Sequence, residues 1–78
     1  MHYVYILKCA DDHYYTGCTE DLDVRVGKHS KGYVDSTKDR LPVKIVFYCA
    51  FAEKEKAFTF EKYLKSGSGI AFRNKHLL

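Results

Sequence analysis

The feature that most constrains this chain is a predicted β-hairpin at its start. Residues 2–9, HYVYILKC, are rich in β-branched and aromatic side chains, which is typical of a strand. The following ADDH supplies turn residues, and residues 14–18, YYTGC, predict the second strand. Gly17 inside that strand indicates a bulge, or a place where another backbone or a ligand comes close. The sheet is therefore expected to contain an antiparallel pair formed by these two strands.

The middle of the chain predicts a helix, a loop and a strand. Residues 19–32 begin with Thr19 as a possible N-cap and acidic residues for the first turn, and Gly32 provides a C-terminal stop, so we expect a helix. Residues 33–42 carry turn formers and a terminal proline, which is typical of a loop. The VKIVFYCAFA segment that follows is the strongest strand signal in the chain, and we expect it at the centre of the sheet.

Two helices are expected in the last third. Residues 53–65, EKEKAFTFEKYLK, place apolar side chains on one helical face. The SGSG segment after them indicates a break, with Ser68 as the N-cap of a final helix over residues 70–78. The order β-β-α-β-α-α predicts an α+β fold, in which a small three-stranded, at least partly antiparallel sheet is flanked by helices.

Length and composition limit the class of protein. With 78 residues, one domain over residues 1–78 is expected. No apolar run approaches the roughly 20 residues needed to span a bilayer, and no signal segment is present, so we expect a cytoplasmic chain with no membrane partner. The three cysteines form no C-x-x-C pair, which indicates free thiols in a reducing compartment rather than a zinc site. Composition leaves the oligomeric state open.

Arg25 and His29 are the first candidates for chemistry. They lie four residues apart on the predicted helix, so their side chains share a face. They also lie beside the apolar pair Leu22 and Val26. An arginine and a histidine held together at such a boundary could clamp a phosphate and manage a proton. On spacing alone, the favoured interpretation is an ordinary helix surface, on which the arginine extends toward solvent and the histidine is inert.

Glu61 and the tyrosines are ambiguous as well. Glu61 lies three residues after Phe58 and three before Leu64, inside or beside the apolar face of its helix. An inward carboxylate needs a cation, either Arg25 or a metal ion such as Mg²⁺, which often takes only one or two protein carboxylates. A salt bridge at the helix margin is the alternative. The chain also has seven tyrosines, and periodicity does not show which of them carries chemistry.

Four segments, in this order, resemble the GIY-YIG nuclease domain: YVYIL, then YYTG, DLDVRVGKH and AFTFEKYLK. The resemblance covers about residues 2–76 and is nearest to the small stand-alone bacterial type. It implies a site on one face of a three-stranded sheet that cleaves phosphodiester bonds with one divalent metal ion, Mg²⁺ or Mn²⁺. The residues that match catalytic positions of the family are Tyr5, Tyr15, Arg25 and His29, the match to the metal ligand is Glu61, and Gly17 and Asn74 are auxiliary candidates.

The resemblance gives these residues a division of labour. Arg25 is expected to neutralise charge on the phosphate, and Glu61 to hold the metal ion. Tyr5 or Tyr15, assisted by His29, is expected to position and deprotonate the attacking water. A phenol has a pKa of about 10, so it needs positive charge nearby to act as a base at neutral pH.

Two departures from the family pattern keep a second hypothesis open. The first motif, Tyr3-Val4-Tyr5, lacks the initial glycine of the family, and Cys18 stands where several active nucleases have lysine. The leading hypothesis is a metal-dependent endonuclease acting on nucleic acid, with DNA the expected substrate. The alternative is an inactive module that retains the fold and binds nucleic acid or protein.

The charge balance is compatible with a nucleic-acid partner without identifying one. The chain has 13 Lys and Arg against 10 Asp and Glu, a net charge of +3, and such a bias often reflects only solvated surface. If nucleic acid binds, its backbone is expected to contact basic residues, and each contact adds to the salt dependence of binding. The candidates are Lys28, Lys31, Lys38, Arg40, Lys44, Arg73 and Lys75.

Overall fold

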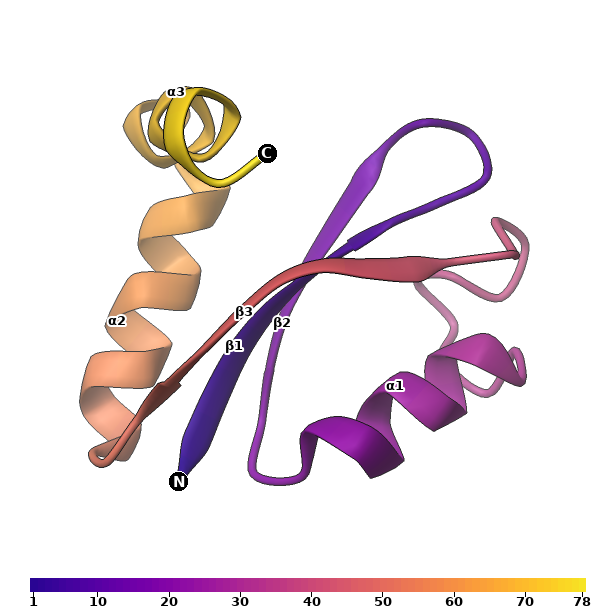
Figure 1. Ribbon diagram of the computed structural model, residues 1–78, viewed down its shortest axis with the longest axis horizontal. Helices are drawn as coiled ribbons and strands as arrows, with labels where there is room; N and C mark the ends of the chain where they lie inside the picture. The colour runs from indigo at the N-terminus through magenta and orange to yellow at the C-terminus, as the bar shows by residue number, and fades with distance from the viewer.

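The computed structural model describes residues 1–78 and has the predicted α+β fold and element order. The strands are β1 (His2–Lys8), β2 (Tyr14–Thr19) and β3 (Lys44–Phe51), and the helices are α1 (Leu22–Ser30), α2 (Lys54–Lys65) and α3 (Gly67–His76). The three strands form one antiparallel sheet. In Figure 1, α2 and α3 lie on one side of this sheet and α1 lies on the other. None of the helices is long and apolar enough to cross a membrane.

The central strand is β1, so the prediction that residues 43–52 occupy the centre is wrong. The strand order is β2-β1-β3, and β1 pairs with a neighbour on each side. Residues Val4–Leu7 of β1 are buried, whereas Tyr48 of β3 is 58% exposed. A high β-propensity describes how well side chains suit a pleated surface. It does not encode where in the sheet a strand lies, which depends on pairing between distant segments.

Alternation along β1 separates the hydrophobic core from the candidate site. Val4 and Ile6 form the core with Ala57 and Leu64 of α2. Successive strand residues point to opposite faces, so Tyr5 lies on the other face, where it meets α1. The core thus anchors β1 through two side chains and holds a third against the helix that carries Arg25 and His29.

The starts of α1 and α3 differ from the predicted ones, and a local capping bond sets each of them. Helix α1 begins at Leu22 with Asp21 as its N-cap, because the Asp21 carboxylate accepts a bond from the Val24 amide at 3.2 Å. The predicted cap, Thr19, instead accepts a bond from the Asp21 amide. Helix α3 begins at Gly67, three residues before the predicted start.

The break predicted for the SGSG segment occurs at Ser66 alone, because α2 ends at Lys65 and α3 already begins at Gly67. Ser66 is the N-cap, with its hydroxyl accepting a bond from the Gly69 amide at 3.2 Å, so the prediction of Ser68 is wrong. A Cβ at Gly69 would collide with the backbone of Tyr63 and Leu64. Glycine permits this close approach, and the sequence of alternating Ser and Gly does not indicate which serine caps the helix.

Candidate active site

A hydrogen-bonded chain of three buried side chains lies at the centre of the site. The Tyr5 hydroxyl is 2.8 Å from His29 Nε2, and His29 Nδ1 is 2.8 Å from the Thr37 hydroxyl. Tyr5 is 1% exposed, and His29 and Thr37 are fully buried. The chain connects β1, α1 and the loop before β3, so it joins segments that are distant in sequence.

Burial keeps these groups neutral. Loss of solvation raises the pKa of Tyr5 to about 12, although its interaction with Arg25 works in the opposite direction. Loss of solvation, followed by the positive charge of Arg25, lowers the pKa of His29 below its ordinary value. A phenol is a stronger hydrogen-bond donor than a neutral imidazole. We therefore assign the proton between the two groups to the Tyr5 hydroxyl, which donates it to His29 Nε2. His29 then carries its own proton on Nδ1 and donates it to Thr37.

Arg25 and Tyr15 complete the cluster. Arg25 lies one turn before His29 on α1, and its interaction with the Tyr5 hydroxyl, then with that of Tyr15, raises the arginine pKa further. The Tyr15 ring centroid is 5.0 Å from that of His29 and 6.3 Å from that of Tyr5. The structure therefore brings together all four residues that were predicted to be catalytic, from β1, β2 and α1.

Gly17 is needed for the position of Tyr5. It pairs directly with Tyr5 in the β1–β2 register, and this pairing is regular, so no bulge occurs there. A Cβ at Gly17 would collide with the end of the Tyr5 ring. The sequence indicated a close approach by another backbone or a ligand, whereas the group that comes close is the Tyr5 side chain, which crosses the strand where Gly17 leaves space for it.

Glu61 is partnered by a lysine of its own helix. Its side chain is 21% exposed, and its carboxylate lies 3.2 Å from the Lys65 ammonium. The observed partner is therefore Lys65 and not Arg25, which is the salt bridge at the helix margin that the sequence left as the alternative. The negative charge of Glu61 also acts on Tyr5 and on Cys18, where it adds to the effect of burial in raising the pKa of each group. Glu61 is therefore electrostatically coupled to the tyrosine end of the site.

The predicted nucleic-acid contacts have different surroundings. Arg40 forms an ion pair with Asp11 at 2.8 Å, which lowers the pKa of that carboxyl to about 2, and it thereby ties the loop before β3 to the hairpin turn. Lys38 pairs with Asp35. Arg73 lies over the ring of Tyr14 and donates a bond to Asn74. The remaining four make no ion pair: Lys28, Lys31, Lys44 and Lys75.

Three residues that contribute to this region were missed by sequence reasoning: Thr37, Lys65 and Tyr14. Thr37 lies in the polar segment STKD, which is typical of an exposed loop, and nothing local indicates that it is buried. Lys65 could have been found from its i, i+4 spacing to Glu61. Tyr14 became relevant only through its contact with a helix that is distant in sequence.

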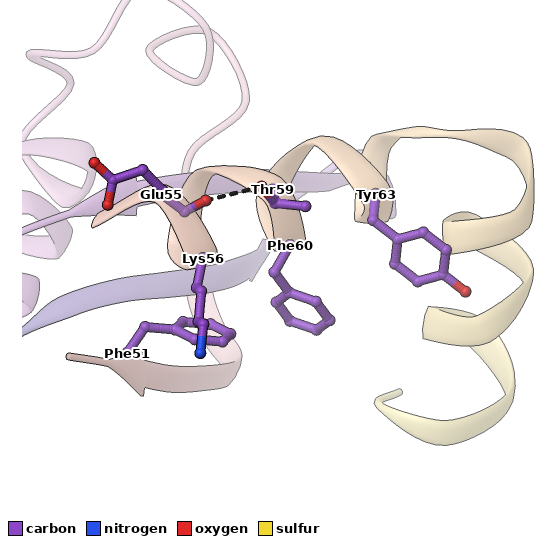
Figure 2. Close-up of a pocket in the computed structure, with 6 residues that line it drawn as sticks. All are labelled: Phe51, Glu55, Lys56, Thr59, Phe60 and Tyr63. Atoms are coloured by element: carbon purple, nitrogen blue, oxygen red, sulfur yellow. Dashed lines mark hydrogen bonds between the residues drawn. The ribbon is translucent and has the colours of Figure 1, made fainter. Parts of the chain in front are cut away.

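The largest groove lies away from this cluster. It has a volume of about 590 Å³ and is formed by α2 and the end of β3, where Phe51, Phe60 and Tyr63 line it. Figure 2 shows the rings of Phe51 and Phe60 side by side, with Tyr63 extending toward α3. No residue of the Tyr5 cluster lines this groove, so its size does not make it the candidate active site.

A family comparison agrees with the geometry. The model of the GIY-YIG catalytic domain matches residues 1–73, which is nearly the whole chain. The chain belongs to the GIY-YIG family. Within this family it is similar to a group of small proteins called UPF0213.

Relatives and a solved structure place this GIY-YIG domain among the UPF0213 proteins. It is 44% identical over 66 residues to the UPF0213 protein CPE1444 of Clostridium perfringens, covering 83% of this chain and 71% of that protein. It is 40% identical over 68 residues to the UPF0213 protein SH2523 of Staphylococcus haemolyticus, covering 86% and 83%. The solution NMR structure of the UPF0213 protein BH0048 from Bacillus halodurans aligns with a TM-score of 0.61 at 39% identity, over 95% of this chain and 82% of that one.

The donor set of this GIY-YIG domain fits a hard divalent cation that is bound mainly through water and substrate. No three His, Cys, Asp or Glu side chains gather closely enough to form a complete protein cage. Mg²⁺ commonly uses one or two carboxylates and completes its octahedron with waters and phosphate oxygens. Glu61 can supply such a carboxylate, and a cation there has to compete with the Lys65 ammonium.

Proposed function

We propose that this GIY-YIG domain is a divalent-metal-dependent endonuclease that hydrolyses phosphodiester bonds of DNA. The observation that carries the proposal is the chain from Tyr5 through His29 to Thr37, with the Arg25 guanidinium against its tyrosine end. A buried proton acceptor bonded to a phenol beside a permanent positive charge is suited to deprotonate a water that attacks phosphorus.

The proton path follows from the neutral state of His29. When Tyr5 takes a proton from the attacking water, it can pass its own proton to His29 Nε2 through the bond of 2.8 Å. The ring is uncharged at neutral pH because burial lowers its pKa, so it has the capacity to accept. Thr37 holds the ring orientation through Nδ1. The phenol therefore acts as a relay, which removes the difficulty that a tyrosine with a pKa of about 12 is almost never ionised at pH 7.

The other residues act on the phosphate. Arg25 stays protonated throughout and would stabilise negative charge on the non-bridging oxygens. Tyr15 is only partly buried and lies beside His29, where it would orient the attacking water. Glu61 would hold the metal ion, which when bound polarises the phosphate and stabilises the leaving oxygen.

The test is cleavage of labelled single-stranded, duplex and branched DNA with Mg²⁺ or Mn²⁺. We expect cleavage by the wild type and its loss in Glu61→Gln, since the amide removes the charge that holds the cation. Glu55→Gln is the matched control, because Glu55 lies on the same helix, is exposed and forms no ion pair. Equal activity of Glu61→Gln and the wild type would contradict the proposal, as would intact DNA of every form across a wide enzyme range.

A binding module without nuclease activity is the second candidate, and the Glu61–Lys65 pair favours it. A carboxylate that stays paired with its lysine does not bind a metal ion, and without the metal ion the proposed hydrolysis does not occur. Mn²⁺ broadens NMR signals of nearby nuclei, so its titration into ¹⁵N-labelled protein separates the candidates. Broadening centred on Glu61 is expected for the nuclease, and salt-sensitive DNA binding without any such broadening is expected for the module.

A further inference from the structure

A second groove is lined by residues of β2, α2 and α3, on the face of the sheet opposite α1, and it shares Tyr15 of the edge strand β2 with the candidate active site. Its volume is about 260 Å³, and its lining combines aromatic, aliphatic and basic side chains: Tyr14, Tyr15, Thr16, Leu64, Lys65, Ile70 and Arg73. Both charged residues in this set are cationic. By contrast, the groove that contains Arg25 and Lys28 at the other end of β2 also contains Glu20 and Asp21. Charge alone therefore makes the groove that contains Lys65 and Arg73 a better site for an anion than the groove that contains Arg25 and Lys28.

Arg73 is held ready for an anion in this groove. Its guanidinium carbon lies 5.1 Å from the centroid of the Tyr14 ring, and its Nε donates to the Asn74 side-chain oxygen at 3.2 Å. No carboxylate pairs with it. The stack and the Nε bond orient the planar group, while its two terminal nitrogens are left to donate. A guanidinium with this geometry can bind a phosphate through two parallel bonds.

Two lining residues connect the groove to the reaction centre. Tyr15 lines the groove and also belongs to the reaction centre, where its ring centroid lies 5.0 Å from that of His29. Lys65 lines the groove and pairs with Glu61. A metal ion taken by Glu61 would displace the Lys65 ammonium from the carboxylate and leave its charge free for the groove. The groove and the metal ligand are thus coupled by one side chain.

We propose that this groove is a nucleotide subsite that holds the nucleotide next to the scissile phosphodiester bond. Arg73 and Lys65 bind the flanking phosphate, and Tyr14 and Ile70 pack against the base or sugar. Apolar and aromatic surface beside basic groups is the combination that proteins use for single-stranded nucleic acid. The position relative to the scissile bond and the release of Lys65 by a metal ion rest on the proposed nuclease function, whereas binding of the nucleotide through Arg73 does not.

The test measures binding without cleavage. ¹⁵N-labelled protein in EDTA is titrated with a single-stranded DNA tetranucleotide, and amide shift changes are expected at Tyr14, Tyr15, Lys65, Ile70 and Arg73. Arg73→Gln is expected to weaken binding about tenfold, since a hydrogen-bonded charge is lost. It should also reduce the slope of log affinity against log salt concentration by about 0.7, the value for one phosphate contact on a single strand.

Lys62→Gln is the matched control, because Lys62 lies on the adjoining helix α2, is exposed, does not line the groove and is not among the predicted nucleic-acid contacts. It is expected to weaken binding less than about twofold. Arg73→Lys preserves the charge but loses the fork, so an intermediate affinity is expected. Circular dichroism confirms that each variant is folded.

The outcomes separate this inference from the nuclease proposal. Equal losses in Arg73→Gln and Lys62→Gln would overturn the subsite, because they would indicate attraction by net charge alone. Shift changes centred on the groove of Arg25 and Lys28 would overturn it too, and so would a failure of the tetranucleotide to bind. If the wild type binds as expected but cleaves nothing with metal, the subsite stands and the nuclease function fails.

Discussion

Replacing Thr37 by Val is expected to destabilise the fold and impair the site together. Valine has nearly the shape of threonine but lacks the hydroxyl that receives the Nδ1 proton of His29 at 2.8 Å. Both residues are fully buried, so water cannot replace the lost partner. An orphaned buried donor costs about 1–3 kcal/mol. At about 4–8 °C per kcal/mol for a domain of this size, the unfolding midpoint should fall by roughly 4–24 °C.

The same substitution should also reduce activity. Without an acceptor at Nδ1, the His29 ring is free to carry its proton on Nε2 instead. That nitrogen could then no longer accept the proton of Tyr5, so kcat is expected to fall while binding of DNA in EDTA stays unchanged. Thermal unfolding followed by circular dichroism and single-turnover cleavage measure the two effects on the same preparations.

Two variants control for the chemistry of the change. Thr37→Ser retains the hydroxyl and should preserve the proton path, with only a small loss of stability from the missing methyl group. Thr59→Val removes an exposed hydroxyl that donates to the Glu55 carbonyl, and its effect should stay within about 0.5 kcal/mol. If Thr37→Val lies within the same limit and cleaves DNA normally, the bond from His29 to Thr37 has neither of the roles assigned here.

Three further perturbations have expected outcomes. Because the unfolded Tyr5 phenol loses its proton near pH 10 and the folded one near 12, the unfolded state binds fewer protons between these values. Stability should therefore fall by up to about 3 kcal/mol as pH rises through this window, and urea titrations should show a flatter profile for Tyr5→Phe. Gly17→Ala should destabilise by about 1–3 kcal/mol through its clash with the Tyr5 ring, whereas Gly27→Ala, which meets no atom within 4 Å, should stabilise α1 by up to about 1 kcal/mol. Calorimetric Mn²⁺ affinity should rise about two- to fivefold in Lys65→Met, since a competing ion pair is lost, and stay constant in Lys62→Met.

Local patterns were sufficient for most of the fold. The hairpin and the order β-β-α-β-α-α follow from propensity, turn residues and amphipathic spacing, all of which act within a few residues. They failed where two local signals compete. Thr19 and Asp21 are both residues that can cap α1, and Ser66 and Ser68 are both residues that can cap α3, so residue type alone does not select between them.

Some features of the candidate site could also be predicted from local patterns, and others could not. Arg25 and His29 share a face because a helix repeats every 3.6 residues, and this could be predicted from their spacing. That His29 faces Tyr5 rather than solvent could not, because burial is a property of the assembled sheet and helix. Family resemblance selected Tyr5 and Tyr15 from seven tyrosines, and pattern alone did not.

The sequence by itself determined the strands, the helices and the spacing of the residues on each of them, since these depend on interactions between near neighbours. Only the tertiary structure decided that β1 is central, that Thr37 supports His29, and that Tyr5 crosses the strand at Gly17. Each of these features depends on contacts between different elements of the fold. Their energies depend on solvent exclusion and on exact distances, which exist only after the chain has folded.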